Sequence, residues 1–339
     1  MFNIKLNPLW SKTVLVITFS FLLLLSSYVL IDPEGSAKNL LNIYNFFAIN
    51  FESFFLYFGF GVLVFLIIIS ISKSGSKKIL LQGRTTYSYF SWYSMLFATG
   101  MGAALLYWST YEWLVYYTNP ISGEEQSLLK ARSYPLFHWT FTGWALYILP
   151  TVSFVFSLMK NPNTPLTFSG ILLKEQSGPL RIILDIFFIG AILTGAGVGL
   201  ALSFPLMSAA VSKLFNLNQT IYLDFLMLLI CMFIVAISVY KGLQNGIRKL
   251  SNFNIILVII FLTLILLAGP TKYIVTNTIE PFVYIVKNYL SLSLIKSQYS
   301  LDWTVFYWAW YIALAPAVGA FIVNTVSYTH LTLPTTSAV

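Results

Sequence analysis

Apolar runs long enough to cross a lipid bilayer recur along the whole chain, and they restrict its fold more than any other feature. They occupy residues 13–31, 52–72, 88–117, 138–159, 181–212, 220–240, 252–269 and 303–326. A helix needs about 20 consecutive apolar residues to span the hydrocarbon core. Only 9% of the residues are charged, whereas soluble domains carry about a quarter. The sequence therefore predicts an all-α polytopic membrane protein in which each run is a transmembrane helix.

The basic residues between the runs indicate the orientation. If the N-terminus lies inside, twelve of the 19 lysines and arginines fall in inner segments and seven in outer ones. Positive charge is retained on the cytoplasmic side, so we expect a multi-pass protein of the plasma (inner) membrane with a cytoplasmic N-terminus. The first run follows Lys5 and Lys12 as a signal peptide would, but it is too long and lacks a convincing cleavage site. We interpret it as a retained helix.

Composition also argues against several classes of function. The net charge of +8 is spread between the apolar runs, so lipid rather than nucleic acid is the expected partner. Cys231 is the single cysteine and there are two histidines, which argues against a disulfide framework and a multi-histidine metal site. The sequence offers no arrangement of paired carboxylates, nucleophile or phosphate-binding loop. We therefore predict no enzyme activity, cofactor or metal.

Glycine-rich stretches interrupt two of the runs. The third run contains "ATGMGAALLYWSTYEW", in which Gly100 and Gly102 flank Met101. Carbonyls released at a helix break can coordinate a cation or a substrate if they line a cavity; the alternative is a small-residue face for helix packing. The fifth run contains "LTGAGVGLALSFP", which favours close packing. There the hydroxyls of Thr194 and Ser203 are expected to bond back to helix carbonyls.

Two runs carry sets of aromatic residues, and in the first of them Trp144 and Tyr147 lie deeper in the helix than a membrane-interface belt requires. One set, in "FHWTFTGWALY", consists of Trp139, Trp144 and Tyr147. The other, in "FYWAWYIALAP", consists of Trp308, Trp310 and Tyr311. At about 100° per residue the first set shares one helical face and the second covers a broader arc. Electron-rich ring faces can hold a quaternary ammonium, which has no N–H to donate; core packing combined with an interfacial belt is the alternative.

Five stretches, taken in order, resemble the betaine/choline/carnitine transporter (BCCT) family: "GMGAALLYWSTYEW", "FHWTFTGWALY", "SVYKGLQNGIRKLSNFN", "LLAGPT" and "WTVFYWAWYIALAP". The resemblance extends from about residue 8 to about residue 324. It implies a LeuT-type inverted-repeat transporter fold, in which two five-helix repeats follow two extra helices. This chain is expected to be truncated after the first helix of the second repeat.

The resemblance divides the chain into five parts. They are an N-terminal segment with two extra transmembrane helices (1–87), the first inverted repeat of five helices (88–269), an extracellular amphipathic connector (270–302), the first helix of the second repeat (303–326) and a non-native tail (327–339). The final "VSYTHLTLPTTSAV" looks like translated adapter read-through; the alternative is a natural short tail. Without the remaining helices, we expect the chain by itself to transport nothing.

The function that the resemblance implies is secondary transport, by alternating access, of a small quaternary-ammonium or zwitterionic compatible solute of the betaine, choline or carnitine class. The substrate would lie near the membrane midplane, in an aromatic box formed by the two aromatic sets and bordered by Gly100, Met101 and Gly102. A homotrimer is the implied assembly. A membrane channel and a non-transporting osmolyte sensor are the alternatives.

The chain departs from the family pattern in its aromatic box. Family members usually carry a second tryptophan at the position of Tyr311 and another aromatic residue at the position of Leu314. The predicted box is therefore thinner here, which weakens the argument for betaine itself as the substrate.

The coupling ion, Na⁺ or H⁺, is left open by the sequence. Sodium-coupled members use hydroxyls on the fifth span, where this chain has apolar residues such as Ile192 and Ala196. Sodium coupling through that site is not expected. A second family ion site would use carbonyls around Ala98 and Met101, together with hydroxyls from a later helix.

Three isolated polar residues are interpreted as structural. Glu112 is expected near the outer end of its span, where it meets water or a helix end. Asp185 is expected at the interface, one helical turn after Arg181. His138 is expected to cap a helix or to lie at the interface.

Overall fold

The computed structural model describes residues 8–73, 79–80, 87–100, 103–120, 125–161, 164–173, 178–325 and 328–329. Its α-helices are α1 (Pro8–Ile31), α2 (Pro33–Ile71), α3 (Tyr89–Gly100), α4 (Ala103–Thr118), α5 (Leu128–His138), α6 (Phe141–Lys160), α7 (Phe168–Leu172), α8 (Pro179–Phe215), α9 (Ile221–Tyr240), α10 (Arg248–Ala268), α11 (Thr271–Leu294) and α12 (Val305–Thr325). Short π-helices lead into α10 and α12; they are η1 (Leu243–Ile247) and η2 (Ser300–Thr304). The strands β1 (Ile79–Leu80) and β2 (Tyr328–Thr329) pair antiparallel. Apart from this two-residue strand pair, the described elements are helices, and the predicted α-helical membrane architecture is confirmed.

Seven helical stretches in the described part of the chain are long and apolar enough to cross a membrane. They correspond to seven of the predicted runs, so the multi-pass prediction is confirmed. The exception is the run 88–117, which is divided between α3 and α4, two helices that are each shorter than a span. Met101 and Gly102 lie between these helices, outside the described residues, and the predicted helix break there stays a prediction.

The second helix is longer than hydropathy predicts. It begins at Pro33 rather than at residue 52. Asp32 caps it, because a side-chain oxygen of Asp32 accepts a 2.9 Å hydrogen bond from the backbone N–H of Gly35, and proline suits the first helical position. The first half of α2 carries charged residues and several asparagines. These lower the local hydropathy without opposing helix formation, which is why the sequence interpretation missed the true start.

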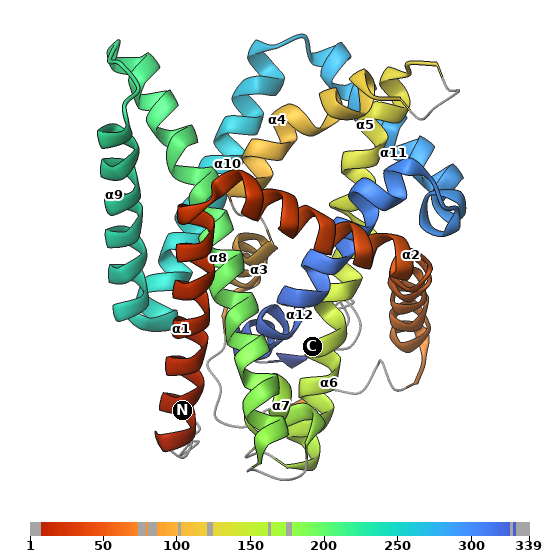
Figure 1. Cartoon of the computed structure of the whole chain (residues 1–339). Coiled ribbons are helices and arrows are strands. Elements are labelled where there is room, and N and C mark those ends of the chain that lie inside the picture. The colour runs from red at the N-terminus through yellow and green to blue at the C-terminus, as the bar shows by residue number, and fades with distance from the viewer. Residues whose placement is uncertain are drawn as a thin grey trace.

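Helices α6 and α12 form the centre of the molecule and pack on each other more extensively than any other described pair. Figure 1 shows α12 crossing beside α6, with α2 running across the same region. α2 and α8 also pack on α12, while α1 and α9 pack on α8. The main buried cluster draws residues from α2, α5, α6, α11 and α12. This arrangement places the aromatic residues of α6 opposite those of α12.

Polar contacts attach α11, which occupies most of the predicted connector, to the helices beside the centre. Arg132 on α5 donates a 2.8 Å hydrogen bond to the hydroxyl of Tyr273 and another to the side-chain oxygen of Asn277. The hydroxyls of Thr142 on α6 and Tyr289 lie 2.6 Å apart. The start of α6 is therefore held from the α11 side.

Two expectations about α8 can be compared with the structure. The hydroxyl of Ser203 donates to the carbonyl of Gly199, which confirms that this hydroxyl bonds back to its own helix. Arg181 Nε and Asp185 Oδ2 lie 3.5 Å apart one turn along the helix. The two residues therefore form an ion pair, and Arg181 is buried.

Candidate functional site

Five rings from α6, α12 and the turn before α6 form the aromatic cluster: Trp139, Trp144, Tyr147, Tyr307 and Tyr311. Ring centroids lie 6.2 Å apart for Trp144 and Tyr147 and 4.8 Å apart for Tyr147 and Tyr311. They lie 6.4 Å apart for Tyr311 and Trp139 and 5.6 Å apart for Trp139 and Tyr307. All four contacts are edge-to-face, a geometry that aromatic pairs prefer. α6 and α12, which are distant in sequence, thus bring their aromatic rings together in one cluster, with the ring planes nearly perpendicular to one another.

Two glycines allow the backbone to approach this cluster closely. A Cβ added at Gly143 would lie 2.8 Å from two ring atoms of Tyr311, and a Cβ added at Gly100 would lie 2.5 Å from Cη2 of Trp144. Any larger residue would displace these rings. Gly100, a predicted site residue, therefore adjoins the cluster, and α3 ends against it.

Trp308 and Trp310 occupy different faces of α12. Trp308 is 1% exposed; its indole packs against Gly59 of α2, and its ring centroid lies 6.1 Å from that of Tyr311. Trp310 lies about 200° around the helix from Trp308, and its ring contacts Phe306 at 6.1 Å. Trp308 therefore supports the cluster from the α2 side. A direct substrate role for these two tryptophans stays a prediction.

A buried carboxylate adjoins the cluster. Glu112 on α4 is 1% exposed, so the expectation that it meets water is wrong: α5 and α12 pack over it. Its Oε2 accepts hydrogen bonds from the hydroxyl of Tyr307 at 2.8 Å and from Nε1 of Trp139 at 3.3 Å. Its Oε1 accepts a 3.2 Å bond from the hydroxyl of Tyr116. A lone carboxylate inside an apolar run was the available sequence signal, because such a group is costly in a membrane unless it has partners.

His138, the last residue of α5, lies beside this carboxylate and is fully buried, so the expected interfacial position is wrong. Its Nδ1 lies 3.2 Å from the hydroxyl of Tyr116 and 3.5 Å from Glu112 Oε1. Its Nε2 lies 3.0 Å from the hydroxyl of Thr304, and its ring stacks on that of Tyr307. A neutral imidazole that carries its proton on Nδ1 and accepts from Thr304 satisfies both nitrogens.

We call Glu112 and the five residues joined to its carboxylate, directly or through His138, the polar network: Tyr116, His138, Trp139, Thr304 and Tyr307. The sequence interpretation did not connect them. Tyr307 precedes Tyr311 by one helical turn and so lies on the same face of α12. That spacing is visible in the sequence, but the approach of Glu112 from α4 is not.

The predicted ion-binding residues are only partly described. Ala98 is half-buried on α3, and Met101 lies outside the described residues. On α8, Gly195 packs against the side chain of Leu314: a Cβ there would lie 2.7 Å from Cδ2 of that leucine. Among the described residues, there is no group of three or more His, Cys, Asp or Glu side chains that could hold a metal ion. The coupling ion stays open.

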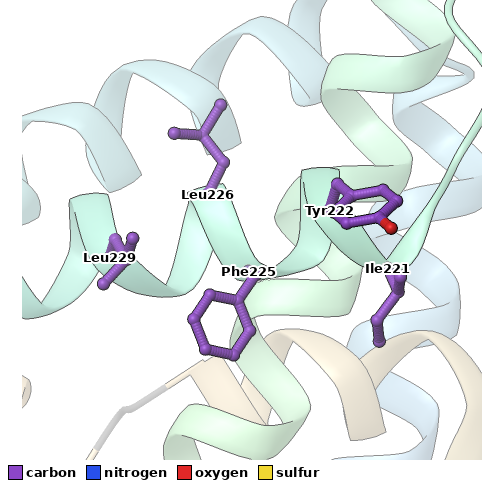
Figure 2. A pocket seen from close by; sticks show the side chains of 5 residues that line it. All are labelled: Ile221, Tyr222, Phe225, Leu226 and Leu229. Atoms are coloured by element: carbon purple, nitrogen blue, oxygen red, sulfur yellow. The ribbon is translucent and has the colours of Figure 1, made fainter.

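An apolar hollow on the outside of α9 is unrelated to this site. Figure 2 shows the side chains that line it, all from one helix: Ile221, Tyr222, Phe225, Leu226 and Leu229. All five side chains are exposed, and α9 lies at the edge of the molecule in Figure 1. An apolar outer surface of this kind suits contact with lipid tails.

The apolar helices define a polytopic membrane protein, and the described residues bury an aromatic and polar cluster between its central helices. Residues 13–328 match the sequence profile of the betaine/carnitine/choline family of transporters, and the chain belongs to this family. The resemblance read from the five motifs is thereby confirmed. Membership also places the protein in a class of transporters rather than enzymes.

Curated relatives cover a large share of the chain. It is 28% identical over 280 residues to a carnitine transporter of Acinetobacter baumannii, covering 79% of this chain and 51% of the relative. It is 27% identical over 334 residues to a glycine betaine transporter of Acinetobacter baylyi, covering 94% and 49% respectively. It is 30% identical over 337 residues to a glycine betaine/proline/choline/ectoine transporter of Vibrio parahaemolyticus, covering 93% and 58%. The chain thus spans about half the length of these relatives.

Proposed function

We propose that the protein acts in the secondary transport of small quaternary-ammonium or related zwitterionic compatible solutes, and that the aromatic cluster binds them. The observation that carries this proposal is the meeting of Tyr147 and Tyr311, from α6 and α12, with ring centroids 4.8 Å apart. A trimethylammonium group has no N–H to donate, so ring faces recognise it better than hydrogen-bond acceptors do. The two helices supply those faces together.

The energetics of ring faces are adequate for this role. Each ring contributes about 0.5–2 kcal/mol of attraction to a cation, so three or four rings give useful affinity without a carboxylate in contact with the ligand. The rings of Tyr147 and Tyr311 are in contact. We infer that they move apart when the substrate binds and that the substrate then lies between them. Trp139 and Trp144 then flank the cation.

The proposed architecture is of the LeuT type. The first inverted repeat comprises residues 88–269, which contain α3 to α10, and it follows α1 and α2. α11 lies in the extracellular connector 270–302, and α12 opens the second repeat. A helix break at Gly100–Gly102 would release backbone carbonyls beside Trp144. A cytoplasmic N-terminus and a homotrimer complete the proposal.

The names of the relatives support the substrate class. They specify carnitine, glycine betaine, and a set of glycine betaine, proline, choline and ectoine. Proline and ectoine carry N–H groups, unlike the other solutes. A substrate panel must therefore include both kinds of solute.

Uptake measurements test the proposal. The complete gene product that contains this chain is expressed in cells lacking their own osmolyte carriers, and accumulation of radiolabelled betaine, choline, carnitine and ectoine is measured. We expect saturable accumulation of at least one quaternary ammonium. A channel would give flux that does not saturate, and a sensor would give binding without accumulation. Neither uptake nor binding across the panel would reject the proposal.

A further inference from the structure

We propose that Glu112 is a positioning residue for the aromatic cluster: its carboxylate fixes the rings of Trp139 and Tyr307 and makes their faces richer in electrons. The inference rests on the proposed function, because it gives the polar network a role in binding a quaternary ammonium. Glu112 itself does not contact the ligand in this scheme. It acts through the two rings that donate to it.

One carboxylate oxygen of Glu112 accepts hydrogen bonds from both rings, those of Tyr307 and Trp139. The hydroxyl of Tyr307 and Nε1 of Trp139 donate to the same atom, Glu112 Oε2, at 2.8 Å and 3.3 Å. The two rings meet edge-to-face at an interplanar angle of 70°. Two donors that converge on one atom restrict the angle between their rings. The rings of Tyr307 and Trp139 also contact Tyr311, with centroids 6.5 Å and 6.4 Å from its own. The position of the Glu112 carboxylate therefore also influences the position of the Tyr311 ring.

The carboxylate is itself held from several elements. The Tyr116 hydroxyl donates to Oε1, and His138 lies 3.5 Å from the same oxygen. Thr304 of η2 holds the other side of the imidazole. Every neighbour of Glu112 in the polar network can donate a hydrogen bond, as an ionised carboxylate requires. A fixed acceptor of this kind can orient rings more firmly than apolar packing alone.

Hydrogen bonding to an ionised acceptor also changes the rings electronically. Such bonds are stronger than neutral ones, and hydrogen-bonded groups polarise one another in a low-dielectric interior. A phenol or indole that donates to a carboxylate carries more negative charge on its ring face. Because a cation is attracted by that negative face, Glu112 strengthens binding at a distance. A purely structural role would join α4, α5 and α12 without affecting ligand affinity.

Two variants separate these roles. Glu112→Gln removes the charge and retains the shape, and Tyr307→Phe retains the ring and removes its donor. The matched control is Tyr299→Phe. Tyr299 is also buried, but its hydroxyl donates to the backbone carbonyls of Tyr116 and Asn119, at 2.9 Å and 2.8 Å. The control thus loses a buried hydroxyl in the same region whose hydrogen bonds go to these two backbone carbonyls.

The probes are choline and its uncharged isostere 3,3-dimethylbutan-1-ol, with glycine betaine and 3,3-dimethylbutanoate as a second pair. Affinities are measured by titration calorimetry on the purified complete gene product, and the melting temperature of each variant is recorded. We expect Glu112→Gln and Tyr307→Phe to weaken binding of the quaternary ammonium by about 5- to 10-fold. Binding of the carbon isostere should change by less than about twofold. Tyr299→Phe should lower only the melting temperature.

Unchanged affinity for the quaternary ammonium in both variants would overturn the inference while leaving the proposed function intact. An equal loss for the ammonium and for its isostere would also overturn it, because a general disturbance of the site would then explain the result. If Glu112→Gln does not fold, Tyr307→Phe decides alone. A wild-type protein that binds neither choline nor glycine betaine would instead remove the proposed function itself.

Discussion

The ring of Tyr311 lies against the backbone of Gly143, so closely that a Cβ at position 143 would come within 2.8 Å of two ring atoms. The contact joins α12 to α6, the two helices that pack most extensively on each other. Gly143 and Tyr147 both lie on α6, so this contact also determines the position of the Tyr311 ring relative to Tyr147. A missing side chain on one helix therefore determines the position of a ring on another.

Gly143→Ala should disturb this contact directly. The added methyl group must displace the Tyr311 ring or separate the helices, and overpacking of this kind costs about 1–3 kcal/mol. We expect a lower melting temperature and weaker binding of the quaternary ammonium. Gly61→Ala on α2 is the matched control, because nothing lies within 4 Å of a Cβ there and alanine favours a helix. Equal stability and affinity in the two variants would show that the contact is not tight.

Replacing Trp144 tests the cation–π role of the cluster. Trp144→Phe should weaken binding modestly, because a phenyl face is poorer in electrons than indole, and Trp144→Leu should weaken it more. A ring worth about 1–2 kcal/mol corresponds to roughly a 5- to 30-fold loss of affinity. Calorimetric titration with the transported solute measures the series. Equal affinities for wild type, Phe and Leu would remove Trp144 from the binding site.

The same substitution at Trp310 examines the other face of α12. Its ring contacts Phe306, so Trp310→Leu should reduce affinity less than Trp144→Leu does. An equal or larger loss would place Trp310 in direct contact with the substrate.

Transport should depend only weakly on sodium through the α8 site. The positions where sodium-coupled members carry hydroxyls hold apolar side chains here, such as Ile192 and Ala196, and a hydrocarbon side chain cannot replace water around Na⁺. The measurement is uptake into proteoliposomes with Na⁺ replaced by K⁺, with and without an imposed proton gradient. A steep dependence on two sodium ions would contradict this prediction.

The buried carboxylate of Glu52 should stabilise the attachment of α2 to η2. Glu52 is 5% exposed; it accepts a hydrogen bond from the hydroxyl of Ser300 and lies 3.6 Å from Lys296 Nζ. Ser300→Ala should lower stability by about 1–3 kcal/mol, because it removes a buried donor to a charged group. Lys296→Met should cost less than about 1 kcal/mol, because that lysine side chain is 56% exposed and exposed ion pairs contribute little. Thermal melting in detergent compares the two variants, and a larger effect of Lys296→Met would contradict the prediction.

The sequence by itself determined the membrane class, the approximate helices and the family. Hydropathy depends on local composition, so the runs that became α1, α8, α9 and α10 could be located without a structure. It failed at α2, where polar residues in the first half of the helix hide a start that Asp32 caps. Ordered motifs identified the family because each is a contiguous stretch of chain.

Only the tertiary structure decided which side chains meet. Helical angles placed Trp144 and Tyr147 on one face, but the contact of Tyr147 with Tyr311 depends on how α6 crosses α12. Glu112 and His138 looked like interfacial residues because their burial comes from other elements, not from their own helices. Helix packing sets the distance between residues far apart in sequence, and local periodicity carries no information about that distance. That is why the aromatic sets were visible in the sequence, whereas the contact of the Glu112 carboxylate on α4 with Tyr307 on α12 was not.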